Sequence, residues 1–311
     1  MRSVRMGLIP PLLLCILLLP ALAACGVRTP TTATPTSEAS PTAAAAPQED
    51  ATALPTQAPD PTATSTPPPT EQKAAEGPLT PQDVSVDPGA LAEYVHGEIV
   101  PGTSYDPNMP PTMNGEPEHL RYLFDDYPAD DFFTPYRTQL LIYPLEAYRT
   151  LYEGTPVEET FDTSQATLRD ILEQRPTEYE DQIPTLPEIA SVQVLRTRIK
   201  YLEFEGGHGV RFITYYAHDV TPMSHENALY TFQGVTDDGR YHVAFYSPIR
   251  TDALPDTYDN SPAADDYDTF AEEFERYLIE TSTTLEALPA NQFEPSLDVL
   301  DGVIRSLTIR R

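Results

Sequence analysis

Residues 207–246 have the sequence GHGVRFITYYAHDVTPMSHENALYTFQGVTDDGRYHVAFY, which decides the fold. Within it, β-branched and aromatic residues cluster in three runs, and such runs are typical of strands. The runs are Val210–Tyr216, Ala228–Val235 and Tyr241–Tyr246. The pair Asp238-Gly239 separates the last two runs, and an Asp-Gly pair in this setting indicates a tight β-hairpin.

A second turn precedes this stretch. The glycine-rich residues 205–209 follow a further strand-like run over about 192–204. We therefore predict a four-stranded antiparallel meander over about 191–248.

On both sides of the meander in the sequence, apolar residues recur at helical spacing. One helix is expected from Tyr267 to Leu278 after an acidic turn, and another after Pro295. A third carries Leu168, Ile171 and Leu172, with Asp162 and Gln165 as its expected capping pair.

Nearer the front, strands are expected within 84–100, at 120–124 and at 139–143, all as edge strands, with a helix through Tyr148 after the last. Because strands and helices are mixed and sequence neighbours are antiparallel, the predicted class is α+β, a mainly antiparallel sheet flanked by helices.

The N-terminus has the parts of a secretory signal. An apolar run from Leu8 to Leu22 follows two arginines, and small residues follow the run. The tetrapeptide Leu22-Ala23-Ala24-Cys25 resembles the lipobox of bacterial lipoproteins, whose cysteine receives diacylglycerol. The alternatives are an ordinary signal peptide and an uncleaved anchor, although a spanning helix needs about 20 apolar residues. We predict a signal peptide over 1–24 and lipidation at Cys25.

Lipid on Cys25 would hold the protein on a membrane, because two or more acyl chains anchor durably. The predicted location is therefore the cell membrane, with the protein facing the extracytoplasmic side. The stretch that follows is rich in Thr, Pro and Ala, and no Tyr or Phe precedes Tyr94. Such a composition buries little apolar surface, so we predict a disordered tether over 25–82 and a globular domain over 83–311.

Charge and cysteine content exclude several classes of protein. The formal net charge is −29 at pH 7, which argues against nucleic acid as a partner. The two cysteines are Cys15, within the predicted signal, and Cys25. The predicted mature chain therefore has no internal disulfide and no free thiol for catalysis.

Acidic residues suggest one candidate metal site. The carboxylates of Asp125, Asp126, Asp130 and Asp131 bracket a Tyr-Pro-Ala sequence, and calcium prefers oxygen ligands from such loops. The spacing lacks the glycine and glutamate of an EF-hand, and a solvated acidic loop explains the same residues. No cofactor is expected, with calcium as the alternative.

The residue types of a hydrolytic triad occur close together in His218-Asp219 and Ser224-His225-Glu226. A triad needs its base between nucleophile and acid, and no Gly-x-Ser-x-Gly sequence surrounds Ser224. The six histidines also lack the spacing of a zinc site. We predict no catalytic residues, and a hydrolase is the third alternative.

Tyrosines are concentrated beside the acidic loop, and tyrosine is common in recognition surfaces as well as in sheet packing. The residues concerned are Tyr122, Tyr127, Tyr136, Tyr143, Tyr148 and Tyr152.

Three segments carry a resemblance to known proteins: Gly209–Ala217, Leu229–Val243 and Leu297–Leu307. They are similar to a group of uncharacterised bacterial lipoproteins with Thr/Pro tethers. The meander and terminal helices also resemble, more loosely, the extrinsic photosystem II (PsbP-like) α/β/α sandwich, and this resemblance implies a non-enzymatic binding or assembly protein. The expected function is thus a lipid-anchored extracytoplasmic binding or assembly module for an unknown protein or surface ligand. A calcium- or carbohydrate-binding surface domain is the alternative.

Overall fold

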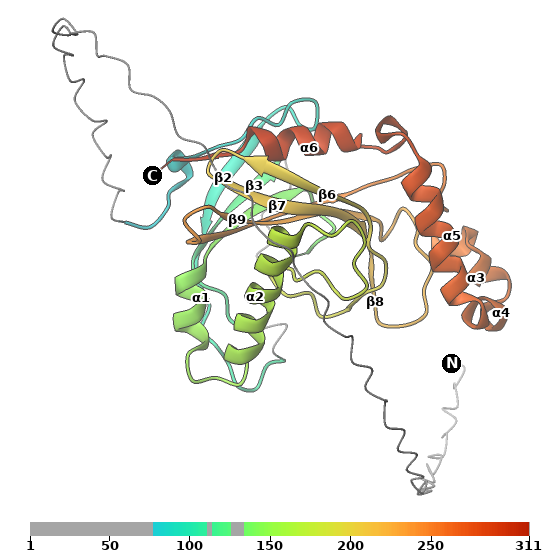
Figure 1. The fold of residues 1–311 in the computed structure, drawn as a ribbon, viewed down its shortest axis with the longest axis horizontal. Helices are drawn as coiled ribbons and strands as arrows, with labels where there is room; N and C mark the ends of the chain where they lie inside the picture. Colours follow the sequence, from blue (N-terminus) through green and yellow to red (C-terminus); the bar gives the residue numbers. More distant parts are fainter. Residues whose placement is uncertain (1–76, 111–113, 126–133, 311) are drawn as a thin grey trace, which may run out of the picture. The chain divides into compact units, whose positions relative to one another are not determined.

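The computed structural model describes residues 77–110, 114–125 and 134–310 (Figure 1). The predicted signal peptide, Cys25 and most of the predicted tether lie outside the described residues. Packing begins at Leu79, which is buried, and Thr80 forms a reciprocal capping box with Asp83. The packed chain therefore starts slightly before the predicted boundary at 83. Every helix in the described part of the chain is too short or too polar to cross a membrane.

The class is α+β, as predicted. The main sheet among the described residues has seven antiparallel strands in the order β2 (Val95–Val100), β3 (His119–Phe124), β4 (Gln139–Pro144), β10 (Tyr241–Pro248), β9 (Leu229–Thr236), β7 (Gly207–Thr214) and β6 (Thr197–Phe204). Strands β6, β7, β9 and β10 are the predicted meander, and the turn between β9 and β10 contains Gly239 with φ +67°.

Two short ribbons accompany the main sheet. β1 (Val84–Ser85) pairs with β11 (Thr308–Ile309), so the first and last described strands lie side by side. β5 (Val192–Gln193) pairs with β8 (Tyr216–Ala217). The single strand predicted over about 192–204 is therefore two strands, β5 and β6.

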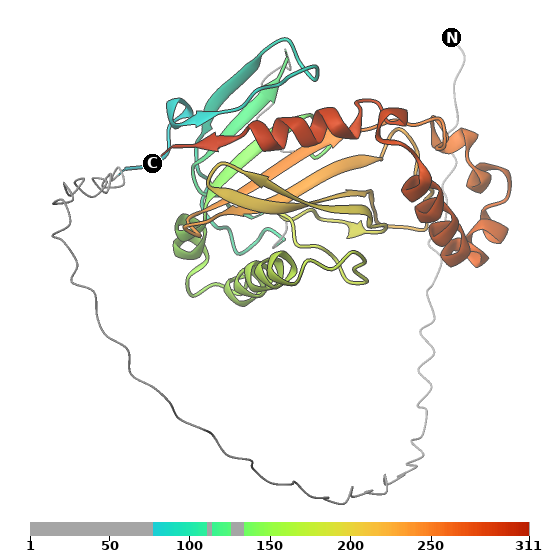
Figure 2. The same ribbon diagram turned by 45° about the horizontal axis from the view of Figure 1, so that its top comes forward.

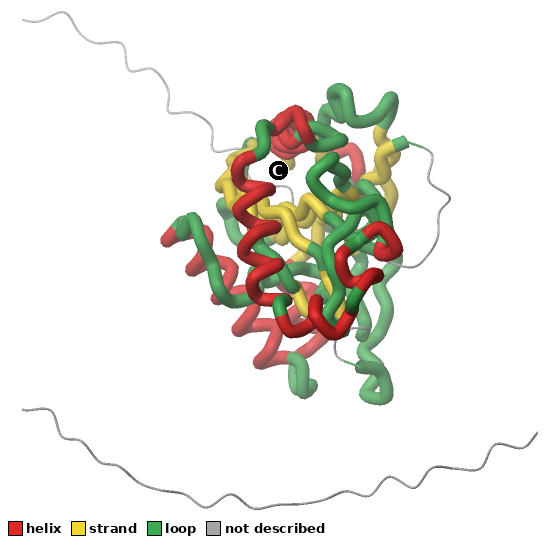
Figure 3. Tube along the Cα trace, turned by 90° about the vertical axis from the view of Figure 1, so that its right-hand side faces the viewer, coloured by secondary structure: helices red, strands yellow, loops and turns green. Residues whose placement is uncertain are grey.

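Helices cover both faces of the main sheet. α1 (Leu145–Tyr152) and α2 (Glu158–Gln174) lie on one face, and α6 (Leu297–Ser306) lies on the other (Figure 2). The arrangement is a three-layered α/β/α sandwich. The remaining helices, α3 (Pro262–Asp265), α4 (Tyr267–Glu272) and α5 (Phe274–Ala287), gather at one end of the sheet (Figure 3).

Strand alternation builds a core on each face. Along β10, Val243 and Phe245 belong to the apolar cluster beneath α6. Their neighbours Ala244 and Tyr246 belong to the cluster beneath α1. Because both faces are covered, β9 is buried along its whole length.

Three local expectations were wrong. β3 and β4 are interior strands, because β4 pairs with both β3 and β10, and β2 is the edge. α2 begins at Glu158, so Asp162 lies within the helix, 3.7 Å from Arg149, and does not cap it. The helix expected from Tyr267 is interrupted at Glu273, which separates α4 from α5.

Candidate functional site

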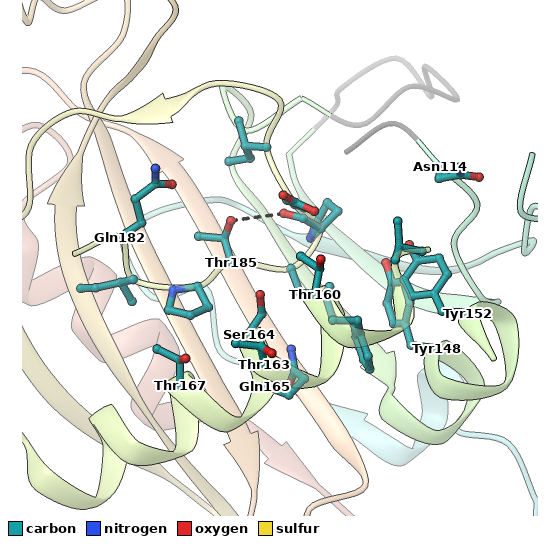
Figure 4. Close-up of a pocket in the computed structure, with 18 of the residues that line it drawn as sticks. Asn114, Tyr148, Tyr152, Thr160, Thr163, Ser164, Gln165, Thr167, Gln182 and Thr185 are labelled. Carbon is teal, nitrogen blue, oxygen red and sulfur yellow. Dashed lines mark hydrogen bonds between the residues drawn. The ribbon is translucent and has the colours of Figure 1, made fainter. Parts of the chain in front are cut away.

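A cavity of about 280 Å³ lies between α2 and the segment 182–189 on the α1/α2 face. Its lining combines five Thr or Ser hydroxyls, four side-chain amides, two carboxylates and a group of aromatic rings. Figure 4 shows Thr160 and Ser164 projecting from α2 toward Thr185 on the facing segment. The cavity is thus a polar pocket with aromatic walls.

Buried glutamines of two strands hold the facing segment in place. Gln193 of β5 donates to the Ile183 carbonyl at 3.1 Å and accepts from the Ile183 N–H at 2.9 Å. Gln233 of β9 accepts from the Leu186 N–H at 3.1 Å. Segment 182–189 is therefore fixed to the sheet at two points by paired polar groups, as a preformed site requires.

The aromatic wall comes from α1 and the start of α2. The rings of Tyr148 and Phe161 stack with their centroids 5.3 Å apart, and Tyr152 packs edge-on to Phe161 at 5.7 Å. The Tyr152 hydroxyl donates to the Gly115 carbonyl at 3.0 Å. These contacts give the pocket a rigid apolar side next to its polar lining.

Two carboxylates give the pocket a negative field. Burial raises the pKa of Glu116, although the hydrogen bond from Tyr143 (3.2 Å) and the charge of Arg121 each act to lower it. Burial also raises the pKa of Glu188, which lies at the exposed rim. Burial and then the charges of Glu116 and Glu188 raise the pKa of Tyr152 to about 12. Both carboxylates belong to the lining of the cavity.

Gln165 is the lining residue whose hydrogen bonding is incomplete. Its side chain projects from α2, the residue is only 2% exposed, and its Oε1 has no partner among the described residues. An unpaired buried carbonyl costs about 1–3 kcal/mol. A ligand that donates a hydrogen bond to Oε1 would remove this cost.

Only one of the four candidate metal residues, Asp125, lies within the described residues. Asp126, Asp130 and Asp131 lie outside the described residues. Asp125 has φ +60°, and its Oδ1 accepts from the backbone N–H groups of Glu93 (2.7 Å) and Tyr94 (3.4 Å). Its carboxylate thus serves the turn before β2. Within the described ranges, no group of three or more His, Cys, Asp or Glu is arranged to hold a metal ion.

The triad residue types are not assembled around Ser224. Ser224 Oγ accepts from the Glu226 N–H at 3.3 Å. His225 directs Nδ1 to Asp256 at 2.9 Å and Nε2 to the Thr251 carbonyl at 2.8 Å, so both ring nitrogens are engaged elsewhere. His218 instead lies 3.0 Å from Ser191 Oγ, a pairing that the sequence did not suggest.

Four of the six predicted tyrosines are buried in the core. Tyr143, Tyr148 and Tyr152 belong to the cluster beneath α1, and Tyr148 and Tyr152 also line the pocket, whereas Tyr122 packs in the cluster beneath α6. Tyr136 is 41% exposed, and Tyr127 lies outside the described residues.

The α2 contribution to the pocket was missed, although the sequence contains a signal for it. Gln165 occupies the apolar stripe of α2 between Phe161 and Leu168, at helical spacing. Thr160, Ser164 and Thr167 repeat at the same spacing, and each lies one residue before a member of that stripe. A polar residue within an apolar stripe is the pattern that a buried polar site on a helix produces.

Comparison with protein-family models, with curated proteins and with solved structures finds no match to this chain.

Proposed function

We propose that this protein is a lipid-anchored, extracytoplasmic binding module without catalytic activity, and that its pocket takes a small polyhydroxylated molecule such as a sugar. The observation that carries the proposal is the unpaired Oε1 of Gln165 in the pocket lining. A hydroxyl group is a small donor that can satisfy this acceptor while also accepting from neighbouring groups.

The remaining lining fits the same class of ligand. Hydroxyls of Thr160, Ser164 and Thr185 can exchange hydrogen bonds with a polyol. Tyr148 and Tyr152 also line the pocket, and tyrosine is suited to amphipathic ligands. Pockets of a few hundred Å³ that combine apolar walls with a few placed polar groups are typical of small-molecule sites.

The anchoring part of the proposal rests on the resemblance of Leu22-Ala23-Ala24-Cys25 to a lipobox. Lipid on Cys25 would place the pocket outside the cytoplasmic membrane, where free and wall-bound sugars occur as ligands. The absence of an assembled triad around Ser224 favours binding over hydrolysis.

The test is calorimetric titration of the full-length protein with a panel of mono- and disaccharides. Saturable binding is expected for at least one sugar, and Gln165→Leu should weaken it at least tenfold because the acceptor is removed with little change of volume. Gln174→Leu, on the exposed side of the same helix, is the matched control and should bind as wild type. Absence of binding across the panel, or equal binding by Gln165→Leu, would refute the proposed site.

A further inference from the structure

Two carboxylates share the pocket, and no cationic side chain joins them. Glu116 and Glu188 both line the cavity, and its described lining contains no Lys, Arg or His. Both carboxylates also raise the pKa of Tyr152, which lines the same cavity. The negative charge of the cavity is not matched by a counter-ion from the lining.

Cations near the pocket are engaged elsewhere or neutral. Arg121, which acts on Glu116, donates from Nε to Glu98 at 2.7 Å. His119 Nδ1 lies 3.9 Å from Glu116 Oε2 but 3.0 Å from the Pro117 carbonyl. Burial lowers the pKa of His119 to about 4, so it is neutral at pH 7.

The surroundings of the carboxylates suit a positive group on a ligand. Burial disfavours the charged form of Glu116, and partial burial does the same for the Glu188 carboxyl at the rim, so a bound cation would offset both effects. Tyr148 and Tyr152 line the same pocket, and an aromatic ring attracts a cation that reaches its face. Separately from the two carboxylates, the buried and unpaired Oε1 of Gln165 indicates that the pocket binds a ligand.

We infer that the ligand carries a protonated amine beside its hydroxyls, as an amino sugar does, with the amine held by Glu116 and Glu188 and a donor group directed at Gln165. This inference rests on the proposed function and specifies its ligand class. It also predicts discrimination, because a neutral or N-acetylated analogue leaves the two carboxylates without a counter-charge.

The experiment compares glucosamine and galactosamine with the neutral parent sugars and with the N-acetylated sugars, by calorimetry on the full-length protein at about pH 6, where amines are protonated. An amino sugar should bind at least tenfold more tightly than its neutral and N-acetylated counterparts. Glu188→Gln should reduce that preference to less than threefold, because one of the two carboxylates that would face the amine is lost. Because Glu188 is exposed at the rim, this change should not disturb folding.

Glu173→Gln is the matched control, since it removes the same charge from an exposed position on α2 outside the pocket. It should keep the full preference for the amino sugar. Equal affinity for amino, N-acetylated and neutral sugars would overturn the amine inference and leave the proposed function standing. Binding of none of the probes would overturn both.

Discussion

At the scale of single residues, close packing of glycines under an aromatic ring sets the geometry of the central sheet. Gly209 of β7 and Gly234 of β9 lie directly opposite each other. The ring of Phe232 covers both, and a Cβ added at Gly209 would lie 2.3 Å from that ring and 2.6 Å from the Gln233 carbonyl. Glycine is required here for space, since these residues have ordinary strand backbones.

Gly209→Ala should lower the free energy of unfolding by about 1–3 kcal/mol, the usual cost of overpacking a core. Gly302→Ala should instead raise the free energy of unfolding, because α6 leaves open space around Gly302 and alanine favours a helix by up to about 1 kcal/mol relative to glycine. Urea unfolding of both variants measures the contrast. A neutral Gly209→Ala would show that Phe232 can move aside without cost.

Histidine burial makes stability depend on pH. Burial lowers the pKa of His242 to about 3, and its Nε2 donates to Gln233 Oε1 at 2.8 Å. An unfolded histidine has a pKa of about 6.5, so below that pH the unfolded chain binds a proton that the native chain does not. The contribution of His242 is therefore present above about pH 6.5 and is lost as pH falls toward about 3.

Between pH 7 and pH 5, His242 should account for a loss of about 2 kcal/mol in the free energy of unfolding. His242→Gln should remove this part of the decline, whatever its effect at pH 7. His208→Gln, at an exposed position beside Asp237, should retain it. The measurement is urea unfolding at both pH values, and an unchanged pH slope in His242→Gln would contradict the assignment.

At the scale of elements, the sequence predicted local hairpins well and distant pairings poorly. The Asp238-Gly239 turn joins neighbours in sequence, so its signal is complete within a few residues. The partners of β4 are not local: Ile142 lies opposite Leu120 on one side and Val243 on the other. Alternation of residue types gives the faces of a strand but not its neighbours, so the sequence does not show that β3 and β4 are interior strands.

The pocket likewise combines residues that are close in sequence with residues that only folding brings together. Of the six tyrosines singled out in the sequence, Tyr148 and Tyr152 line the cavity, and both come from one helix, α1. Glu116 and Glu188 join them only through the packing of α1 and α2 on the sheet. No spacing rule connects residues brought together in this way.

Helix α6 is attached to the sheet by a buried charge cluster as well as by apolar contacts. Asp301 is fully buried, and it accepts from Arg211 Nε at 2.9 Å, Lys200 Nζ at 2.7 Å and the Tyr230 hydroxyl at 3.0 Å. Burial alone would raise the pKa of Asp301, but the hydrogen bonds from Arg211 and Lys200 lower it. The carboxylate therefore remains charged in the core.

Asp301→Asn should destabilise the protein by about 3–5 kcal/mol, because it leaves the buried Arg211 without its counter-charge. Asp298→Asn, in the exposed first turn of α6, is the control and should cost less than about 1 kcal/mol. Thermal and urea unfolding report both effects. Equal stability of the two variants would mean that apolar packing alone attaches α6.

At the scale of the whole molecule, we expect the folded part to be separable from the proposed membrane attachment. The pocket lies on the α1/α2 face, whereas Leu79 and Val84, at the start of the packed chain, belong to the cluster beneath α6. The site and the entry of the chain are thus on opposite faces of the sheet. Ligand binding is expected to be independent of lipidation.

Cys25→Ala should abolish incorporation of labelled fatty acid and release the protein from the membrane or leave it as precursor. Its affinity for the panel sugars should equal that of wild type, since the pocket is unaltered. Metabolic labelling and fractionation of cells expressing either form make the comparison. Acyl label retained by Cys25→Ala would exclude the lipobox assignment.

The pairing of β1 with β11 also determines how the molecule would respond to mechanical load. A pull transmitted from the proposed membrane anchor would reach the packed chain at Leu79, and would then act on the Arg310 N–H bond to Asp83 and on this two-residue ribbon. These bonds would open one after another, because the load peels the strand from its end. Release of residues 77–94 would add about 60 Å of chain at about 3.3–3.6 Å per residue before force reached β2. Opening of the β1–β11 ribbon would then lengthen the connection between the anchor and the folded domain while the ligand pocket stays intact.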